Sequence, residues 1–321
     1  MKLEPPDLDR AALAGALRRR WGIDPERVEY APVGYGSHHW DAVGADGSHW
    51  FVSADELGGG DATLARLDRA FRTAVALRDR GGLEFVLAPV VSRDGAALHR
   101  LGVRYAIRVE PFVEGPSGVD GEFESADERR AMGTLLGRLH TASDSVPAAL
   151  PGREGLALPG RAALELAIAE LDGEWGPGRF AEPARELLRA HASEVGHRLH
   201  AYDGRTRRAL DAPGRWVVTH GEPHSSNVIQ GPGGPWLVDW DTTLVGPPER
   251  DLWMILDADL TGWDEYREAA GADRLDEELL ALYRERWALA EICEYVAELR
   301  EPHEDTEDTR ASWRILGEYL P

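Results

Sequence analysis

The feature that most restricts the fold of this chain is a short strand-rich segment between long helical patterns. Residues 216–218, 228–229 and 236–238 are apolar runs typical of strands, and the turn residues 231–234 separate the last two runs. This spacing predicts a small β-hairpin over residues 228–238. Polar residues at the two ends of the hairpin are therefore expected to lie close together, although the two strands separate them in the sequence.

Helices are predicted on both sides of this segment. Ser125 and Glu128 form the pattern of a capping box, and the helix that follows places Met132, Leu136 and Leu139 on one apolar face. Apolar periodicity typical of helices also covers residues 160–172, 183–200, 275–299 and 307–319. The second half of the chain is therefore predicted to be mainly helical around the hairpin.

The N-terminal part has a different order of patterns. A helix, a strand, a helix and two strands are predicted in turn over residues 1–30, 50–52, 61–79, 84–91 and 105–109. These patterns favour an α+β fold. A small antiparallel sheet with its helices is expected in residues 1–110, and a mainly helical lobe in residues 111–321.

Length and composition restrict the class of protein. At 321 residues the chain is longer than a single hydrophobic core usually supports, which favours two lobes. No stretch of about 18 apolar residues occurs, and the first residues lack an apolar signal segment. We therefore expect a cytoplasmic protein that does not contact a membrane. The single cysteine, Cys293, excludes an internal disulfide and is expected to pack in the core.

The chain is strongly acidic. Its formal net charge is −21, and Lys2 is its one lysine, so 35 of its 36 basic residues are arginine. This balance argues against a nucleic-acid partner. It is compatible with a cationic small-molecule partner, and equally with a genomic base composition that favours Ala, Arg, Gly and Asp. Either a monomer or a homodimer is compatible with the sequence.

The polar residues around the predicted hairpin have the spacing of a phosphoryl-transfer site. His220 and Glu222 precede Asn227, and Asp239 follows the second strand of the hairpin. Phosphoryl transfer needs a carboxylate near the attacking hydroxyl, and oxygen ligands that hold Mg²⁺ against the nucleotide phosphates. The protein-kinase pattern H-R-D-x-x-x-x-N, followed by D-F-G, places the same residue types at similar spacing.

This segment resembles the aminoglycoside-phosphotransferase and choline-kinase-like family, whose members carry H-G-D-x-x-x-x-N and then a D-W element. Residues 247–253, which follow the motif, make spectinomycin-type phosphotransferases the most similar subgroup. The resemblance implies a two-lobed protein-kinase-like fold, ATP or GTP as the phosphoryl donor, and Mg²⁺ as the cofactor. It also implies that the γ-phosphoryl group moves to a hydroxyl of an antibiotic-like small molecule, an activity that confers resistance.

The resemblance assigns a role to each motif residue. Glu222 is implied as the catalytic carboxylate, and His220 as the residue that orients the loop. Asn227 and Asp239 are implied as metal ligands, with Asp241 as a further carboxylate beside the metal. The family has Asp where this chain has Glu222, so the carboxylate here is one methylene further from the backbone.

Asp251 lies after the motif and is implied to anchor the catalytic loop rather than to contact the acceptor.

A second departure from the family concerns the phosphates. Kinases hold them with a lysine on the third strand, paired with a glutamate on the following helix. Here residues 50–56 contain no lysine and residues 61–73 no glutamate. Arginine can replace lysine because its guanidinium binds phosphate oxygens bidentately. The candidate replacements are Arg66, Arg69, Arg72 and His38. The alternative is that the three arginines are solvated charges on the helix surface.

Two further segments are candidates for nucleotide binding. Gly34, Gly36 and Ser37 form a loop whose backbone N–H groups can approach phosphates, although two glycines near a strand are also common in a plain hairpin turn. Glu110 lies where the two lobes are expected to join, the place at which a kinase-like fold binds the adenine through its main chain. Residue type alone does not decide either assignment.

The resemblance implies that the acceptor binds among acidic residues that follow the motif, which here are Asp257, Asp259, Asp264, Glu265, Glu291 and Glu294. Asp257 and Asp259 are carboxylates able to bind ammonium groups, and Trp253 and Trp263 are candidate walls for a ring of the acceptor. The alternative is that the acidic side chains only form a solvated helix surface.

Other functions compete with antibiotic phosphorylation. One is a metabolic kinase of the same fold acting on a sugar, nucleoside or amino alcohol. Another is a catalytically weak nucleotide-binding protein, which the missing lysine and glutamate favour and the intact Glu222, Asn227 and Asp239 disfavour. A zinc site at His220 and His224 is disfavoured because Pro223 interrupts the helix that such a pair would need.

Overall fold

The computed structural model describes residues 3–34, 36–119, 121–211 and 214–320, so Tyr35 of the predicted glycine loop lies outside the described residues. The chain divides into two compact units. The first combines Met1–Glu154 with Arg215–Leu275, and the second combines Gly155–Gly214 with Asp276–Pro321. The predicted boundary at residue 110 would separate the N-terminal sheet from the rest of the first unit, and it stays a prediction.

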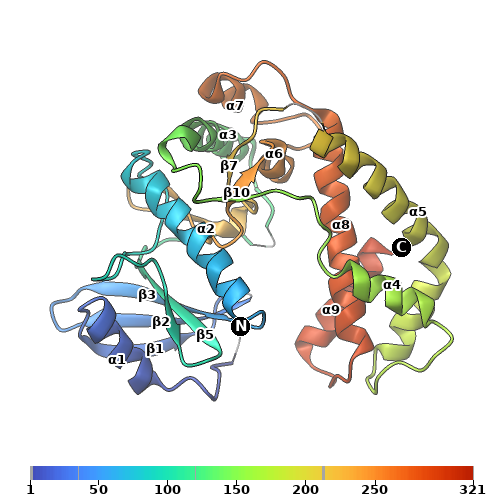
Figure 1. The fold of residues 1–321 in the computed structure, drawn as a ribbon, viewed down its shortest axis with the longest axis horizontal. Helices are drawn as coiled ribbons and strands as arrows, with labels where there is room; N and C mark the ends of the chain where they lie inside the picture. The colour runs from blue at the N-terminus through green and yellow to red at the C-terminus, as the bar shows by residue number, and fades with distance from the viewer. Residues whose placement is uncertain (1–2, 35, 120, 212–213, 321) are drawn as a thin grey trace. The chain divides into compact units, whose positions relative to one another are not determined.

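An antiparallel sheet of five strands forms the N-terminal part of the first unit (Figure 1). In sheet order the strands are β1 (Pro25–Ala31), β2 (Ser37–Gly44), β3 (His49–Glu56), β5 (Tyr105–Pro111) and β4 (His99–Leu101). Trp40, Val52 and Val109 lie on one face and are fully buried. The register places Ser53 beside Arg108. Because side chains alternate along a strand, Ser53 and Arg108 lie on the opposite face.

Each face of this sheet is covered by one helix. The two helices are α1 (Arg10–Arg20) and α2 (Asp61–Asp79). Asp9 caps α1 by accepting hydrogen bonds from the backbone of the first turn, and Leu13 packs in the same core as Trp40. On the other face, Phe71 of α2 lies 4.4 Å from the Arg108 guanidinium carbon, measured to the ring centroid. The sheet is therefore enclosed by α1 and α2 on opposite sides (Figure 1).

Two sequence predictions for this region are wrong. Residues 1–30 are not one helix, because α1 ends at Arg20, Gly22 adopts a positive φ of 75°, and the chain continues as β1. Residues 84–91 are not a strand, because only Val86 forms a β-bridge there, to Leu237. The apolar residues of this segment reflect burial in an irregular loop. The predicted helix over residues 61–79 and the strand over 105–109 are confirmed.

The rest of the first unit is helical around short strands. Its elements are α3 (Ala126–Thr141), η1 (Ala142–Ser145), β6 (Gly152–Arg153), β7 (Val217–Thr219), η2 (Ser225–Asn227), β8 (Val228–Gly231), β9 (Gly234–Leu237), β10 (Leu244–Gly246), α6 (Glu249–Ile255) and α7 (Trp263–Ala270). The capping box of Ser125 and Glu128 is present at the start of α3. The hairpin of β8 and β9 is also confirmed. The strand before it, β7, pairs instead with β10, in a separate sheet that also contains β6.

Two glycines allow α3 and α7 to pack closely. A Cβ atom at Gly133 would lie 2.2 Å from the carbonyl oxygen of Gly262, and one at Gly137 would lie 2.5 Å from the Cβ of Ala269. Any larger side chain would push the helices apart. This contact fixes α7 against α3 within the first unit.

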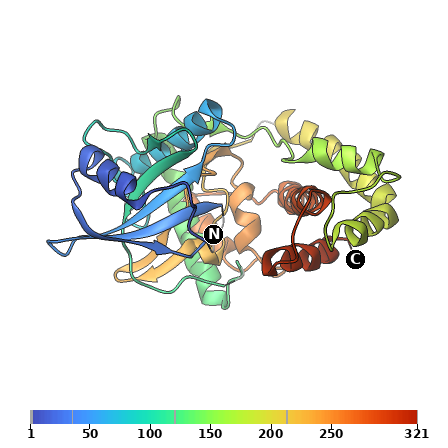
Figure 2. The same cartoon turned by 90° about the horizontal axis from the view of Figure 1, so that it is seen from below.

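The second unit contains helices α4 (Arg161–Ala169), α5 (Ala181–Asp211), α8 (Glu277–Arg300) and α9 (Glu307–Tyr319), as Figure 2 shows. Contacts with α4, α5 and α9 place α8 at the centre of this unit. Cys293 is buried in it, as expected. All four helices were predicted, although α5 extends beyond its predicted end. In the described part of the chain, no helix is long and apolar enough to cross a membrane.

Candidate active site

A buried carboxylate holds the loop that follows β7. Asp251 of α6 is fully buried, and its two carboxylate oxygens accept hydrogen bonds from the backbone N–H of His220 at 2.8 Å and of Gly221 at 2.7 Å. It also accepts a hydrogen bond of 3.0 Å from Nε2 of His140. Burial acts to raise the pKa of Asp251, but the His140 contact holds that pKa below its ordinary value. Asp251 thus anchors the loop as a carboxylate.

His220 connects the loop to the hairpin. Its Nε2 donates to the Val238 carbonyl at 2.8 Å, and its Nδ1 accepts from the backbone N–H of Glu222 at 3.2 Å. The ring packs edge-on against Trp240, with 4.6 Å between centroids. Burial lowers the pKa of His220 to about 4, so the ring is neutral and one nitrogen can accept while the other donates. His220 therefore orients the loop, and both its ring nitrogens are engaged by backbone.

The hairpin brings Asn227 and Asp239 together. Val228 pairs with Leu237, and the backbone N–H of Val238 donates to the Asn227 carbonyl at 3.0 Å. Asp239 follows with a positive φ of 63°, a conformation that Asp tolerates better than most residues. The residues that flank the two strands are therefore held side by side, as the sequence predicted.

The remaining motif carboxylates lie at the same place. Glu222 is half-buried, and its carbonyl accepts a hydrogen bond of 2.9 Å from the Asn227 side-chain nitrogen. Burial, followed by the negative charges of Asp239 and Glu222, raises the pKa of Asp241 to about 7. Burial likewise raises the pKa of Asp239. The structure therefore brings Glu222, Asn227, Asp239 and Asp241 together in a region of excess negative charge.

These donors suit a magnesium ion that is shared with a nucleotide. Among the described residues, no group of three carboxylate, imidazole or thiolate side chains is placed to hold a metal by itself. Mg²⁺ is usually bound by one or two carboxylates together with substrate phosphates, and it prefers oxygen ligands. The Asn227 amide and the Asp239 and Asp241 carboxylates can supply such oxygens. Zinc is disfavoured here because both ring nitrogens of His220 already have backbone partners.

A buried arginine lies beside Asp239. Arg108 of β5 has a side chain that is 5% exposed, and its Nη2 lies 3.9 Å from Oδ1 of Asp239. Its Nη1 donates to Oδ2 of Asp55 on β3, and its Nε donates to Oε1 of Glu110 at 2.7 Å. Burial raises the pKa of Glu110 to about 7 against the opposing effect of Arg108. The other Glu110 oxygen, Oε2, is buried without a hydrogen-bond partner among the described residues.

Sequence reasoning did not identify Arg108 or Asp55. A usable signal was present, because Arg108 and Glu110 occur two residues apart in the otherwise apolar strand around Ile107 and Val109. Charged residues at alternate positions of such a strand share one face and need partners when buried. The partner, Asp55, depends on the pairing of β3 with β5.

The glycine loop is joined to this cluster, and His38 is not. Gly34 and Gly36 adopt positive φ values of 70° and 78° between β1 and β2, and Oγ of Ser37 donates to Oδ1 of Asp55 at 2.6 Å. His38 is buried on the other face of the sheet, where its ring is 6.3 Å from that of Trp40. Strand alternation therefore turns His38 away from Arg108, and the expectation that His38 replaces the lysine is corrected.

Of the three helix arginines, Arg66 reaches the motif. Its Nη1 donates to the Asp241 carbonyl at 2.7 Å, and its Nη2 lies 3.8 Å from Oδ2 of Asp241. Arg72 instead pairs with Asp68 on its own helix at 3.5 Å. Arg69 is exposed on α2. Each step of three residues falls about 60° short of a full helical turn, so Arg66 and Arg72 point about 120° apart around α2, and this drift explains why their partners differ.

The predicted acceptor residues are placed around α6 and α7. Oδ1 of Asp257 accepts backbone hydrogen bonds from Asp259 at 3.1 Å and Thr261 at 2.9 Å, so that carboxylate stabilises a turn. Trp263 stacks on Tyr266 with 5.6 Å between ring centroids. Asp259 is exposed and Trp253 half-buried. The structure does not gather these four residues into one described cavity.

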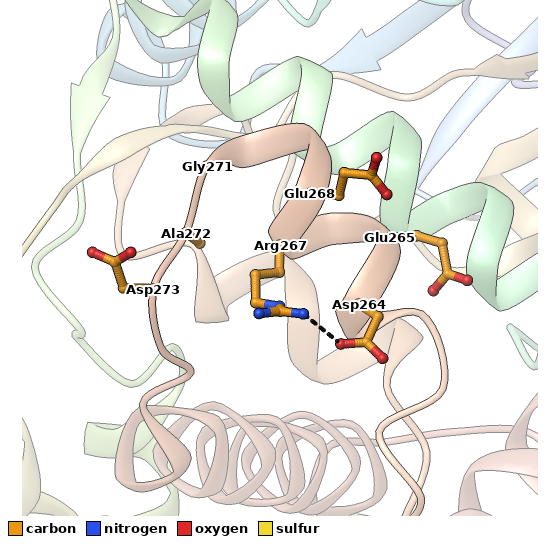
Figure 3. A pocket seen from close by; sticks show the side chains of 7 residues that line it. All are labelled: Asp264, Glu265, Arg267, Glu268, Gly271, Ala272 and Asp273. Carbon is orange, nitrogen blue, oxygen red and sulfur yellow. Dashed lines mark hydrogen bonds and ion pairs between the residues drawn. The ribbon is translucent and has the colours of Figure 1, made fainter.

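An open pocket of about 580 Å³ lies next to α7, and two of the acidic acceptor candidates, Asp264 and Glu265, line it (Figure 3). It is lined by Asp264, Glu265, Arg267, Glu268, Gly271, Ala272 and Asp273. Arg267 donates to Asp264 at 3.3 Å within it. Four of the seven lining residues are acidic, which makes this a cation-attracting surface rather than an apolar binding pocket.

Comparisons with known proteins identify the family of this chain. The family model described as "Phosphotransferase enzyme family" matches residues 31–318. Protein StrN of Streptomyces griseus is 30% identical over 254 residues, which cover 76% of this chain and 74% of StrN.

Solved structures share the fold at low sequence identity. A spectinomycin phosphotransferase in complex with ADP and spectinomycin has a TM-score of 0.76 and 16% identity, with coverage of 97% of this chain and 94% of that chain. An amicoumacin kinase in complex with AMP-PNP and Ca²⁺ has a TM-score of 0.64 and 14% identity, with coverage of 98% and 92%. The choline kinase LicA from Streptococcus pneumoniae has a TM-score of 0.57 and 16% identity, with coverage of 97% and 98%.

The predicted kinase-like α+β fold is therefore confirmed. The family model extends over nearly the whole chain and includes the loop after β7, the β8–β9 hairpin and the strands that hold Arg108. The chain therefore belongs to the phosphotransferase enzyme family and is a small-molecule kinase.

Proposed function

We propose that this enzyme transfers the γ-phosphoryl group of ATP or GTP to a hydroxyl of an antibiotic-like small molecule, and that this modification confers resistance. The observation that carries the proposal is the convergence of Glu222, Asn227 and Asp239, fixed by Asp251 and by the β8–β9 hairpin. It supplies a carboxylate for the acceptor and oxygen ligands for a metal in one place.

The acceptor hydroxyl oxygen forms a bond to the γ-phosphorus, while the bond from that phosphorus to the β–γ bridging oxygen breaks and the nucleoside diphosphate leaves. Glu222 accepts the hydroxyl proton. Its half-buried carboxylate is set by the hydrogen bonds of its own backbone to His220 and Asn227. Asn227, Asp239 and Asp241 would hold Mg²⁺, which neutralises phosphate charge when bound.

The negative charge of the surface after the catalytic motif supports a cationic antibiotic as the acceptor. Exposed carboxylates such as Asp259 lie after the catalytic motif, and the pocket beside α7 is rich in acidic residues. Cationic antibiotics are attracted to such a surface. Among the structures with this fold, one was solved with spectinomycin and another is an amicoumacin kinase.

The acceptor is tested by measuring nucleotide consumption with a panel of antibiotics and metabolites, using both ATP and GTP. We expect turnover with an antibiotic, and a higher inhibitory concentration of it for a susceptible bacterium that expresses the enzyme. Turnover only with a sugar, nucleoside or amino alcohol would identify a metabolic kinase. Nucleotide binding without turnover on any acceptor would favour a weak nucleotide-binding protein.

Glu222→Gln tests the catalytic carboxylate. We expect turnover to fall by a factor of about 10² to 10⁴, because the amide cannot accept the hydroxyl proton. Affinity for the nucleotide should stay nearly unchanged, because the carboxylate acts on the acceptor. Glu26→Gln, at an exposed position of β1, is the control and should keep full activity. Full activity in Glu222→Gln would require another residue as the base.

A further inference from the structure

The chain lacks the lysine with which kinases hold nucleotide phosphates, and Arg108 occupies a suitable place for its replacement. Residues 50–56 of the third strand contain no lysine, and residues 61–73 of the following helix contain no glutamate. The register places Arg108 of β5 directly beside Ser53 of β3, on the face that α2 covers. A cation on β5 is therefore within reach of the space that a side chain from β3 would occupy.

The contacts of Arg108 resemble the lysine–glutamate pair of kinases, but the charges lie on different elements. The cation is on β5, and its carboxylate partners are on β3 and β5. Asp55, on the third strand, accepts a hydrogen bond from Nη1 of Arg108, and Glu110 accepts one from Nε. In kinases the third strand carries the cation, and here it carries the carboxylate. Phe71 of α2 packs against the guanidinium, where a kinase helix would supply its glutamate. Arg108 is therefore held rigidly by partners from both strands and from the helix.

One part of the guanidinium remains directed toward the motif. Nη2 of Arg108 donates no hydrogen bond to the described residues, whereas Nε and Nη1 each donate one, and Nη2 lies 3.9 Å from Oδ1 of Asp239. This distance is too long for a hydrogen bond. An arginine has five N–H donors, and the two on Nη2 suit the oxygens of a phosphate group. The open donors therefore lie next to the residue proposed to hold the metal of the nucleotide.

The same cluster continues to the glycine loop. Asp55 accepts one hydrogen bond from Arg108 and another from Oγ of Ser37, which directly follows Gly36. Asp55 therefore holds both Arg108 and the glycine loop. The loop is expected to cover the phosphates, and Arg108 is expected to bind them. Arg66 differs, because it is half exposed and is bound to the backbone of Asp241.

We propose that Arg108 binds the nucleotide phosphates in place of the missing third-strand lysine, and that Asp55 positions both Arg108 and the glycine loop for this contact. The proposal rests on the proposed function, since it names the group that holds the donor nucleotide. Under this proposal the cation that binds the phosphates beside the metal site is Arg108 of β5, and not an arginine of α2.

Arg108→Lys tests the assignment while keeping the buried positive charge. The affinity for a non-hydrolysable ATP or GTP analogue with Mg²⁺ is measured by calorimetry at a temperature where circular dichroism shows the variant to be folded. We expect the affinity to fall by about 10-fold or more. The single ammonium nitrogen of lysine cannot keep the contacts to Asp55 and Glu110 and also bind phosphate, as the three nitrogens of a guanidinium can. Arg66→Ala should lower the affinity less.

Arg104→Gln is the matched control. Arg104 is also paired with two carboxylates, Asp7 and Glu56, each at 2.8 Å, but it is exposed and lies at the edge of the sheet's other face. Its loss should leave nucleotide affinity unchanged. If Arg108→Lys does not fold, the double variant Asp55→Asn with Arg108→Gln removes one charge of each sign, and the same loss of affinity is expected from it.

The outcomes separate this proposal from the proposed function. If the wild-type enzyme binds Mg²⁺–nucleotide and the folded Arg108 variant binds it equally well, the role of Arg108 is purely structural and this inference is wrong, while the proposed function stands. If the wild-type enzyme binds neither nucleotide, the proposed function is wrong and this inference with it. A loss of nucleotide affinity in the Arg108 variant, but not in Arg104→Gln, supports both this inference and the proposed function.

Discussion

His220 shows how a single buried side chain can hold the loop after β7 without carrying charge. Both of its nitrogens are used by backbone partners, Val238 and Glu222, and this requires the neutral ring. Its neighbours include the anion Asp251 and the cation Arg250, but burial is the dominant influence and lowers the pKa of His220 to about 4. The protonation of this one ring is therefore coupled to the stability of the fold.

The coupling predicts a pH dependence of stability. In the unfolded chain a histidine titrates near pH 6.5, whereas His220 in the folded protein titrates near 4. The unfolded state binds the extra proton between these values, so the free energy of unfolding should fall as pH decreases from about 6.5 to about 4. This group alone contributes at most about 1.4 kcal/mol per pH unit. His39, whose pKa burial lowers to about 3, acts in the same direction.

Urea unfolding of the wild-type protein and of His220→Gln at several pH values between 7 and 4.5 measures this contribution. The difference in unfolding free energy between the two should change with pH, because only the wild-type protein carries this buried ring. A constant difference over the whole range would contradict the neutral buried state of His220.

At the scale of elements, close backbone contacts decide where side chains are tolerated. The crossing of α3 and α7 depends on Gly133, since a Cβ there would lie 2.2 Å from the Gly262 carbonyl oxygen. Gly196 in α5 is also helical, but a Cβ at that position would meet no atom within 4 Å. The same residue type therefore has a packing role in one helix and none in the other.

Replacing each glycine with alanine should change stability in opposite directions. Gly133→Ala is expected to lower the free energy of unfolding by about 1 to 3 kcal/mol, because the two helices must separate. Gly196→Ala is expected to raise it by about 0.5 to 1 kcal/mol, because alanine restricts the unfolded chain and favours a helix. Denaturant unfolding of both variants provides the test, and stabilisation by Gly133→Ala would show that α3 and α7 are not in close contact.

At the scale of the molecule, the proposed site depends on the folded first unit. The glycine loop, β3, β5 and the β8–β9 hairpin supply its residues, and they come from distant parts of the sequence. Such a site does not exist in the unfolded chain. Binding of Mg²⁺–nucleotide should therefore stabilise the fold by mass action.

Thermal unfolding with and without ligand measures this linkage. At a nucleotide concentration about 100 times the dissociation constant, Mg²⁺–nucleotide should stabilise the protein by about 2.7 kcal/mol. Removal of Mg²⁺ with EDTA should remove most of this stabilisation, and Asp239→Ala should remove it even with Mg²⁺ present. Asp144→Ala, at an exposed carboxylate of η1, should respond like the wild type. An Asp239→Ala variant that responds like wild type would contradict its role as metal ligand.

The parts of this protein that depend on near neighbours in the chain can be predicted from residue patterns. Glu222, Asn227 and Asp239 lie within one loop and one hairpin, and local turn chemistry brings them together. The capping box at Ser125 and the periodicity of α2 likewise depend on residues a few positions apart. The hairpin, the capping box and the helix over residues 61–79 are confirmed, because their geometry is specified over short distances.

The pairing of buried charges, in contrast, depends on contacts between distant segments of the folded chain. Arg108 and Asp55 are 53 residues apart, and their contact depends on the register of β3 against β5, which the pattern of either strand alone does not specify. The same register places His38 and Arg108 on opposite faces of the sheet. The apolar segment 84–91 was mistaken for a strand because burial and strand pairing produce the same local pattern. The pairing of distant strands, rather than residue type, decides on which face a side chain lies and whether an apolar segment forms a strand.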